Sequence, residues 1–392
     1  MLKLLKNKQI QRLPKRSLLG FTKLFKYEKI IKFQDKIVLS IYMPPFPGKA
    51  FDRYLEAAIL SKTGKLTPST VNFAITHRCN YNCWHCGATP KKGEDLSLSL
   101  IKDTIKKFQD MGTSIFAITG GEPLLREDLP EIIKSIDDRS SVFMFTTGYG
   151  LTEEKAKELK KAGLFGLMIS LDHYTPEIHD KLRGFKGAYK NATDAVKIAQ
   201  KAGLYVGISS LITREIIQKN EILKFLELAQ NLQVQEAMMI EPHPTGKLLE
   251  SDESMLTPEE RKQFINFHKW ANRKRKYPRV SSFSFIESGE SLGCTAGYSY
   301  LYIDAEGNIR PCDFSPLLRF GNIKKEKIED IWKRLSTTFN KPRSFCFVLG
   351  NYKTIRERSK DRKTYTPEQS VQVCKNCPSG KIPLFYRKFG VR

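Results

Sequence analysis

Between residues 71 and 246, six segments with the pattern of buried β-strands alternate with segments of helical spacing, and this alternation constrains the fold most. Strand–helix units in series predict parallel strands joined by right-handed crossovers. Six units are fewer than the eight of a closed barrel. We therefore expect an α/β fold, a partial (β/α)6 TIM-like barrel. The strand-like segments are residues 71–75, 114–119, 142–146, 165–171, 204–211 and 234–240.

The rest of the chain divides around this series. We expect a basic N-terminal extension (1–70), the α/β core (71–246), a helical linker (247–293) and a small cysteine-rich C-terminal domain (294–392). Thr257-Pro258 followed by Glu260 predicts a helix start inside the linker, because Thr caps, Pro fits the first position and Glu completes the capping box. The alternation of strands and helices is expected to end at residue 246.

Three cysteines, Cys79, Cys83 and Cys86, follow the first predicted strand directly. Three thiolates this close can hold one metal centre, whereas a [4Fe-4S] cube normally takes four cysteines. One iron would then lack a protein ligand, and such an open position lets another molecule bind. A structural zinc site is the alternative, since His77 or His85 can supply the fourth ligand that zinc usually takes.

A second motif, Gly120-Gly121-Glu122, ends the second predicted strand. Two glycines let the backbone approach a ligand closely, and a carboxylate can accept hydrogen bonds from an ammonium group. In folds of this class the active site lies at the carboxyl ends of the strands. The segments 146–148, 170–172 and 241–246 fall at the same edge, which predicts that all of them surround one site.

The cysteine spacing and the Gly-Gly-Glu segment together resemble the radical S-adenosylmethionine (radical SAM) family over about residues 71–246. The resemblance implies that the three cysteines ligate a [4Fe-4S] cluster whose open iron binds S-adenosylmethionine. It implies reductive cleavage to a 5′-deoxyadenosyl radical, which abstracts hydrogen from a peptide or protein, small-molecule or lipid substrate. It also implies an external one-electron donor of the flavodoxin or ferredoxin type.

The same resemblance suggests which residues bind S-adenosylmethionine. A guanidinium at position 183 suits the methionine carboxylate, although an ordinary surface salt bridge is the alternative for it. Most family members have an aromatic residue before the last cysteine; here it is His85, which we expect to pack or hydrogen-bond. The expected cofactor-binding residues are Gly120, Gly121, Glu122, Thr147, Ser170, Asp172 and Arg183.

A second set of cysteines lies near the C-terminus. Cys294 and Cys312 flank a predicted hairpin, and the spacing Cys294-x12-Gly307-x4-Cys312 resembles the opening of a SPASM domain. The resemblance implies one auxiliary [4Fe-4S] cluster, as in the shorter "twitch" variant. A zinc ribbon is the alternative. Cys346 is left over as a replacement ligand, a hydrogen-atom donor or a small buried residue. The four expected ligands are Cys294, Cys312, Cys374 and Cys377.

The net charge of +24 is uneven: residues 1–32 carry ten Lys or Arg and one acid. Such charge favours anionic partners, or it is only a solvated surface. Leu18, Phe21, Leu24 and Phe25 share one side of a possible helix. That pattern predicts peripheral contact with an anionic membrane, with packing against the barrel as the alternative.

Location and function class follow from what the sequence lacks. It has no run of 18 apolar residues and no signal-peptide pattern, so we expect a cytoplasmic, possibly membrane-peripheral protein. Eight cysteines fit that compartment if they bind clusters.

Nucleic acid is an unlikely partner. The alternative function is a non-enzymatic zinc or iron–sulfur protein that binds nucleic acid through its basic regions.

Overall fold

The computed structural model describes residues 7–11, 25–88, 93–359, 364–378 and 380–391. Its main sheet has ten strands: β3 (Thr70–Ala74), β4 (Ile115–Thr119), β5 (Ser141–Thr146), β6 (Gly166–Ser170), β7 (Tyr205–Leu211), β8 (Glu236–Ile240), β9 (Arg279–Ser282), β10 (Tyr300–Ile303), β11 (Asn308–Arg310) and β12 (Gly321–Asn322). Their order is β12-β11-β10-β3-β4-β5-β6-β7-β8-β9, and within the described residues the two ends of the sheet do not pair.

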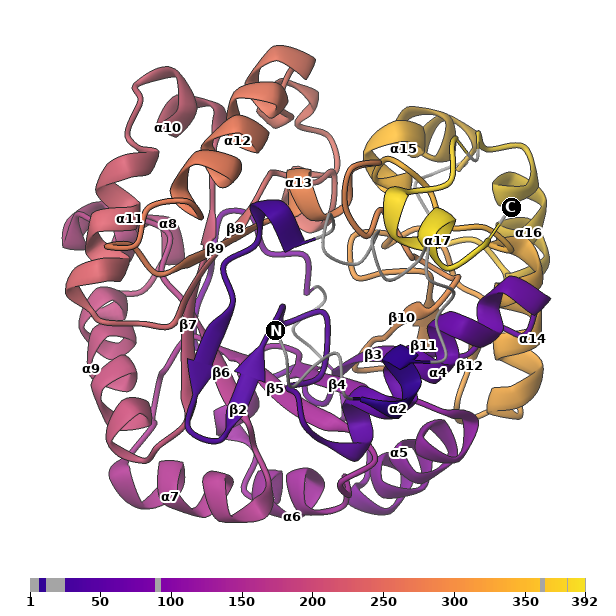
Figure 1. Cartoon of the computed structure of the whole chain (residues 1–392), viewed down its shortest axis with the longest axis horizontal. Helices are drawn as coiled ribbons and strands as arrows, with labels where there is room; N and C mark the ends of the chain where they lie inside the picture. The colour runs from indigo at the N-terminus through magenta and orange to yellow at the C-terminus, as the bar shows by residue number, and fades with distance from the viewer. Residues whose placement is uncertain (1–6, 12–24, 89–92, 360–363, 379, 392) are drawn as a thin grey trace.

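Helices surround the curved sheet (Figure 1). Those that follow the core strands are α5 (Leu98–Met111), α6 (Leu129–Lys134), α7 (Glu153–Ala162), α8 (Pro176–Arg183), α9 (Ala188–Lys201), α10 (Arg214–Gln218), α11 (Ile222–Asn231) and α12 (Pro258–Ala271). The others are α2 (Lys8–Gln11), α4 (Lys49–Leu60), α13 (Phe283–Ile286), α14 (Ile328–Thr338), α15 (Phe347–Arg358), α16 (Pro367–Lys375) and α17 (Leu384–Lys388).

The six predicted strands are confirmed as β3 to β8, all parallel. The predicted α12 start is also confirmed, since the Thr257 and Glu260 side chains form a reciprocal capping box. Each strand is buried on both faces. On the outer face, for example, the α5 side chains Ile101 and Phe108 are fully buried in the same cluster as Phe73 of β3. Burial of each such side chain contributes about 1.5–3 kcal/mol.

The expectation that the alternation ends at residue 246 is wrong. After α12 the chain adds β9 parallel to β8, and β10 adds in parallel beside β3. The parallel part of the sheet therefore has eight strands, and it remains an open barrel. The β9 sequence, Arg-Val-Ser-Ser, has no apolar run that would predict a buried strand. The strand is nevertheless buried, because Arg279 forms ion pairs with Glu28 and Glu236.

The described part of the N-terminal extension lies against one end of the barrel. The hairpin β1 (Ile31–Phe33) and β2 (Lys36–Val38) and helix α4 cross in front of the strands in Figure 1. Buried side chains of this segment, such as Val38 and Phe51, share a hydrophobic cluster with Phe143 and Tyr205 of the sheet. Residues 25–60 therefore pack as part of the barrel, although the sequence predicted a separate piece.

The predicted membrane-binding face falls mostly outside the described residues, which include neither Leu18, Phe21 nor Leu24. Its contact with membranes remains a prediction. Across the part of the chain that the structure describes, no helix combines the length and apolar character needed to cross a bilayer.

Acid should destabilise the fold through His268, which is fully buried on α12 and stacks on Phe285. Burial, helped by the positive charge of Arg279, lowers the pKa of His268 to about 3. The unfolded chain binds this proton near pH 6.5, so stability is lost as pH falls from about 6.5 toward 3, by up to about 1.4 kcal/mol per pH unit. Urea unfolding of wild type and His268→Gln at pH 7 and pH 5 measures this. We expect a smaller pH dependence in the variant; an identical one would contradict the assignment.

Candidate active site

The cysteine loop leaves the carboxyl end of β3 and is held against α8. The backbone N–H groups of Asn82 and Trp84 donate to carbonyls of α8, each at 3.1 Å. Cys79, Cys83 and Cys86 gather in one cluster around the buried ring of Tyr81. All of the cysteines are thiols rather than disulfides.

Two groups donate toward the sulfurs of this loop. The backbone N–H of Tyr81 lies 3.4 Å from Cys79 Sγ, and Arg183 Nη1 lies 3.8 Å from Cys83 Sγ. Burial raises the pKa of Cys83, while the guanidinium of Arg183 opposes that shift. Three thiols in one packed cluster with nearby donors fit a metal centre with three protein ligands, and hydrogen bonds to sulfur tune iron–sulfur clusters.

The two glycines of the Gly-Gly-Glu segment fit against this loop's backbone. A Cβ on Gly121 would lie 2.2 Å from the Arg78 carbonyl oxygen, and one on Gly120 would lie 2.5 Å from that of Thr76. Gly120 also has a φ of +136°, which other residues rarely adopt. The Gly121 N–H donates to the Thr76 carbonyl at 2.9 Å. The close approach that glycine permits here is therefore to the cysteine loop.

Glu122 links the ends of β4 and β5. Its carboxylate is buried and accepts four hydrogen bonds: from the Thr146 hydroxyl (2.6 Å), the Leu124 N–H (3.0 Å), and the N–H (2.7 Å) and hydroxyl (2.5 Å) of Thr147. Burial nevertheless raises its pKa, against these bonds. A carboxylate has about four acceptor positions, so protein donors fill them in this structure. Glu122 as acceptor for the amino group of S-adenosylmethionine stays a prediction.

Glu122→Gln should therefore destabilise the fold as well as affect cofactor binding. The amide NH2 would replace one of the two carboxylate oxygens and face its donors, either those of Leu124 and Thr146 or those of Thr147, which leaves buried groups unsatisfied at a cost of about 1–3 kcal/mol. Denaturant unfolding measures this cost, with Glu127→Gln as the control. Glu127 is exposed on the following turn, so its substitution should stay within about 0.5 kcal/mol. Equal stability of the two variants would contradict the structural role of Glu122.

Asp172 and Arg183 form a buried ion pair at 2.8 Å, between the β6 end and the last turn of α8. Burial opposes ionisation, but the positive charge of Arg183 and the Leu211 N–H together hold the pKa of Asp172 below its usual value. His85 Nδ1 lies 3.9 Å from the same carboxylate, and burial lowers the pKa of His85 to about 4. The surface salt bridge considered for Arg183 is thus excluded by its burial.

A cavity of about 280 Å³ opens at the carboxyl ends of the strands. Four of the predicted cofactor-binding residues line it: Gly120, Ser170, Asp172 and Arg183. The other three, Gly121, Glu122 and Thr147, are not among its described lining residues. Glu122 and Thr147 hydrogen-bond to each other, and Gly121 packs against the cysteine loop. Residues of the cysteine loop, of the β4 and β6 ends and of segment 241–246 line this cavity, whereas segment 146–148 is not among its described lining residues, so one site surrounded by all of these segments stays a prediction.

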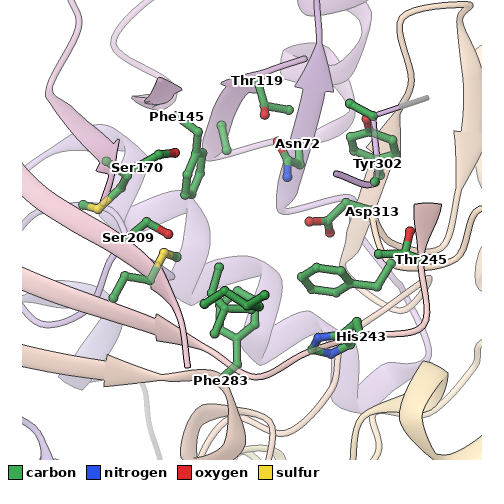
Figure 2. Close-up of a pocket in the computed structure, with 18 of the residues that line it drawn as sticks. Asn72, Thr119, Phe145, Ser170, Ser209, His243, Thr245, Phe283, Tyr302 and Asp313 are labelled. Carbon is green, nitrogen blue, oxygen red and sulfur yellow. The ribbon is translucent and has the colours of Figure 1, made fainter. Parts of the chain in front are cut away.

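The walls of the cavity are largely aromatic and apolar (Figure 2). Phe145 and Ser209 lie on one side, with Tyr302 and Asp313 across from them, and Phe283 and His243 close another side. The described lining also includes Met168, Met238 and Phe314, and Tyr42 from the N-terminal segment. Polar side chains, among them Asn72, Glu241 and Thr245, also line it, and apolar walls with placed polar groups are typical of small-ligand sites.

Sequence reasoning missed a polar chain in this wall. Asn72 of β3 donates to the Tyr300 hydroxyl at 3.1 Å, and that hydroxyl donates to Asp313 Oδ1 at 2.8 Å. Burial raises the pKa of Asp313, with the Tyr300 hydrogen bond opposing the shift. The only sequence signal for Asp313 was its position directly after Cys312.

The structure describes all four of the expected auxiliary cysteines. The predicted hairpin exists as β10 and β11. Cys294 and Cys312 line a second, smaller cavity together with Cys346, the cysteine that the sequence left over. Neither Cys374 nor Cys377 is among the described residues that line it. The four-cysteine set therefore stays a prediction.

Comparisons with known proteins agree with this geometry. Residues 73–229 match the model of the Radical SAM superfamily, and residues 294–378 match that of SPASM, an iron-sulfur cluster-binding domain. An AdoMet-dependent heme synthase of Methanosarcina barkeri is 27% identical over 68% of this chain and 82% of its own length. A probable GTP 3′,8-cyclase of Saccharolobus islandicus is 30% identical over 62% of this chain and 82% of its own length.

Among solved structures, Streptococcus suis SuiB bound to its precursor peptide SuiA superposes with a TM-score of 0.60. The match covers 83% of this chain and 80% of that one, at 14% identity, and supports the fold. A radical SAM domain implies a [4Fe-4S] cluster and S-adenosylmethionine, and a SPASM domain implies auxiliary iron–sulfur clusters. The chain is an enzyme of the radical SAM superfamily, with a C-terminal SPASM domain.

Proposed function

We propose that Cys79, Cys83 and Cys86 hold the cluster that cleaves S-adenosylmethionine, and that the substrate occupies the adjoining cavity. When bound, cluster and S-adenosylmethionine together supply a 5′-deoxyadenosyl radical that abstracts hydrogen from the substrate. The protein's part is to orient both molecules and to exclude water. Arg183 and Ser170 both line the cavity, and in this proposal Arg183 binds the methionine carboxylate and Ser170 another polar part of S-adenosylmethionine.

The observation that carries this proposal is the shared cavity. Arg183 lies both on its wall and 3.8 Å from Cys83 Sγ, so one side chain joins the cysteine loop to the space where a substrate fits. The N-terminal segment supplies Ile41 and Tyr42 to the same wall. A cavity surrounded in this way protects a reactive intermediate from solvent.

The lining favours a substrate that has both an apolar portion and polar groups. Phe145, Met168 and Phe283 offer apolar surface, whereas Asp313 offers a polar contact. The buried hydroxyl of Tyr42 has no hydrogen-bond partner among the described residues, and Tyr42 lines both cavities, so this hydroxyl is available to a substrate. The named relatives are a heme synthase, a probable GTP 3′,8-cyclase and a protein bound to its precursor peptide, so they leave peptide, small-molecule and lipid substrates open for this chain.

Two partners complete the proposal. Reductive cleavage needs an external one-electron donor, and an acidic flavodoxin or ferredoxin suits a chain of net charge +24. The basic N-terminal residues 1–32 are the proposed contact with anionic membranes, through about 1 kcal/mol per Lys or Arg near the surface.

The test is formation of 5′-deoxyadenosine and methionine by anaerobically purified protein. With S-adenosylmethionine and dithionite we expect both products, and none if reductant is omitted or the protein is exposed to air. Ser170→Ala should weaken S-adenosylmethionine binding. The control is Ser135→Ala: Ser135 ends α6 and does not line the cavity. Protein that carries its full iron yet forms no 5′-deoxyadenosine would contradict the proposed function.

A further inference from the structure

We infer that the carboxyl end of α12, together with the N-terminal segment that docks on it, is a folded binding surface for anionic membranes. It consists of Lys26, Tyr27, Ile30 and residues 269–277, and is called the α12 surface below. The inference rests on the proposed membrane contact of residues 1–32 and deepens it, because it adds a structured part from elsewhere in the chain.

Two segments that are 245 residues apart in the chain meet at this surface. The Asn272 side chain donates to the Tyr27 carbonyl at 3.0 Å. The Lys29 ammonium donates to the Tyr277 carbonyl at 2.7 Å. These bonds hold the described start of the basic N-terminal segment beside the sequence Arg-Lys-Arg-Lys of residues 273–276. Two basic stretches of the sequence therefore form one surface.

Cations gather around the Tyr27 ring. Its centroid lies 5.2 Å from Lys26 Nζ, 5.0 Å from Lys269 Nζ and 5.1 Å from the guanidinium carbon of Arg273. All four side chains of residues 273–276 are exposed, and Lys26 is exposed as well. Cations on an exposed surface attract anionic partners.

Few acids offset this charge. Among the described residues, Glu290 pairs with Lys269 at 2.8 Å, and the charge of Glu227 on α11 reaches Lys276. The remaining exposed cations of the α12 surface outnumber these two acids, so its net charge is positive.

Large apolar side chains are exposed on the same surface. Trp270 is 40% exposed and Ile30 is 44% exposed; the described residues include one other large hydrophobic side chain of this exposure, Ile178. Lys274 Nζ lies 5.6 Å from the centroid of the Trp270 ring. At a bilayer surface a Trp ring enters the headgroup region while an ammonium stays in water. An anionic bilayer therefore fits both the charge and the exposed apolar groups.

A nucleic acid is the other anionic partner for a basic surface with aromatic rings. Bases stack on open ring faces. Here cations already lie over the rings of Tyr27, Trp270 and Tyr277. The apolar residues that we expect on one side of a helix, the last of which is Phe25, also lead directly into this surface, and such a helix suits a bilayer.

Fluorescence quenching by brominated lipid tests the position of Trp270. The chain has three Trp residues, and Trp270 is the exposed one. We expect vesicles of phosphatidylserine with acyl-brominated phosphatidylcholine to quench the full-length protein, and Trp270→Phe to remove this quenching. Quenching that persists in Trp270→Phe, or is absent while the protein sediments with the vesicles, would overturn the inference.

Replacing all four residues 273–276 by Gln should weaken sedimentation with phosphatidylserine vesicles at least tenfold, because each cation near such a surface strengthens binding roughly fivefold. High salt should have the same effect. The matched control replaces four exposed lysines of α6, α7 and α9 by Gln, and should change binding less than twofold; in Figure 1, α6 and α7 lie at the bottom and α12 at the top. The control positions are Lys134, Lys157, Lys161 and Lys197.

The outcomes separate this surface from the rest of the account. Equal weakening in the two fourfold variants, or none in the 273–276 variant, would overturn the inference and leave the contact of residues 1–32 standing. Wild-type protein that binds a single-stranded oligonucleotide but no vesicles would overturn both membrane contacts. Circular dichroism confirms that each variant is folded. Formation of 5′-deoxyadenosine is measured separately, so its failure would count against the proposed function alone.

Discussion

Replacing Cys79, Cys83 and Cys86 together with Ala is expected to remove one of two clusters and to abolish S-adenosylmethionine cleavage. Wild-type protein prepared without oxygen should hold about eight irons in two cubes, and the triple variant about four. The reason is that the three thiols cluster around Tyr81 at the end of β3, apart from the cysteines of the C-terminal domain. Iron and sulfide analysis, together with 5′-deoxyadenosine formation, measures both effects.

The auxiliary centre provides the internal control for this variant. Its EPR signal should persist, because none of the substituted residues lines the second cavity. An iron content equal to that of the wild type would contradict the assignment of the three cysteines as ligands. Retention of S-adenosylmethionine cleavage would do so as well.

Arg183→Gln is expected to produce the largest loss of stability among the cavity residues. Asp172 is only 2% exposed, and the substitution leaves its charge buried without the partner at 2.8 Å. Breaking a buried pair by removing one member costs about 3–5 kcal/mol. The free energy of unfolding in denaturant measures the cost. Arg139→Gln is the matched control, since Arg139 pairs with Asp137 at the surface and the loss there should be at most about 1 kcal/mol.

The double variant Asp172→Asn with Arg183→Gln separates stability from cofactor binding. Removing both charges should recover most of the lost stability, because no unpaired charge remains. Binding of S-adenosylmethionine, measured by calorimetry, should stay weak in both variants, since each lacks the guanidinium. A double variant that binds as tightly as the wild type would exclude Arg183 as a contact of the methionine carboxylate.

The strands of the core could be predicted from local sequence patterns. The strand-like runs of β3 to β8 are mostly apolar, as expected for parallel strands in the interior of a sheet. The cysteine spacing and its position after β3 likewise needed no long-range information. These features could be read in advance because each depends on residues close together in the chain.

The features that escaped prediction depend on contacts between distant segments. The strand β9 is stabilised by Arg279, whose carboxylate partners lie on the N-terminal segment and on β8. The meeting of His243 with Cys346 joins residues 103 positions apart. From the sequence we expect Gly121 to leave room for a ligand, whereas in the structure it leaves room for the Arg78 carbonyl. Sequence alone does not show which group lies against a glycine. Periodicity and motif spacing do not encode such pairings.

The most direct test of the central claim is electron–nuclear double resonance of the reduced protein with S-adenosylmethionine labelled in its methionine carboxylate and amino group. We predict magnetic coupling between the labelled atoms and the cluster held by Cys79, Cys83 and Cys86. The coupling should be absent from the triple alanine variant, in which only the auxiliary centre remains. Saturating labelled S-adenosylmethionine that shows no coupling to any cluster of the wild-type protein would contradict the assignment of the site and of its chemistry.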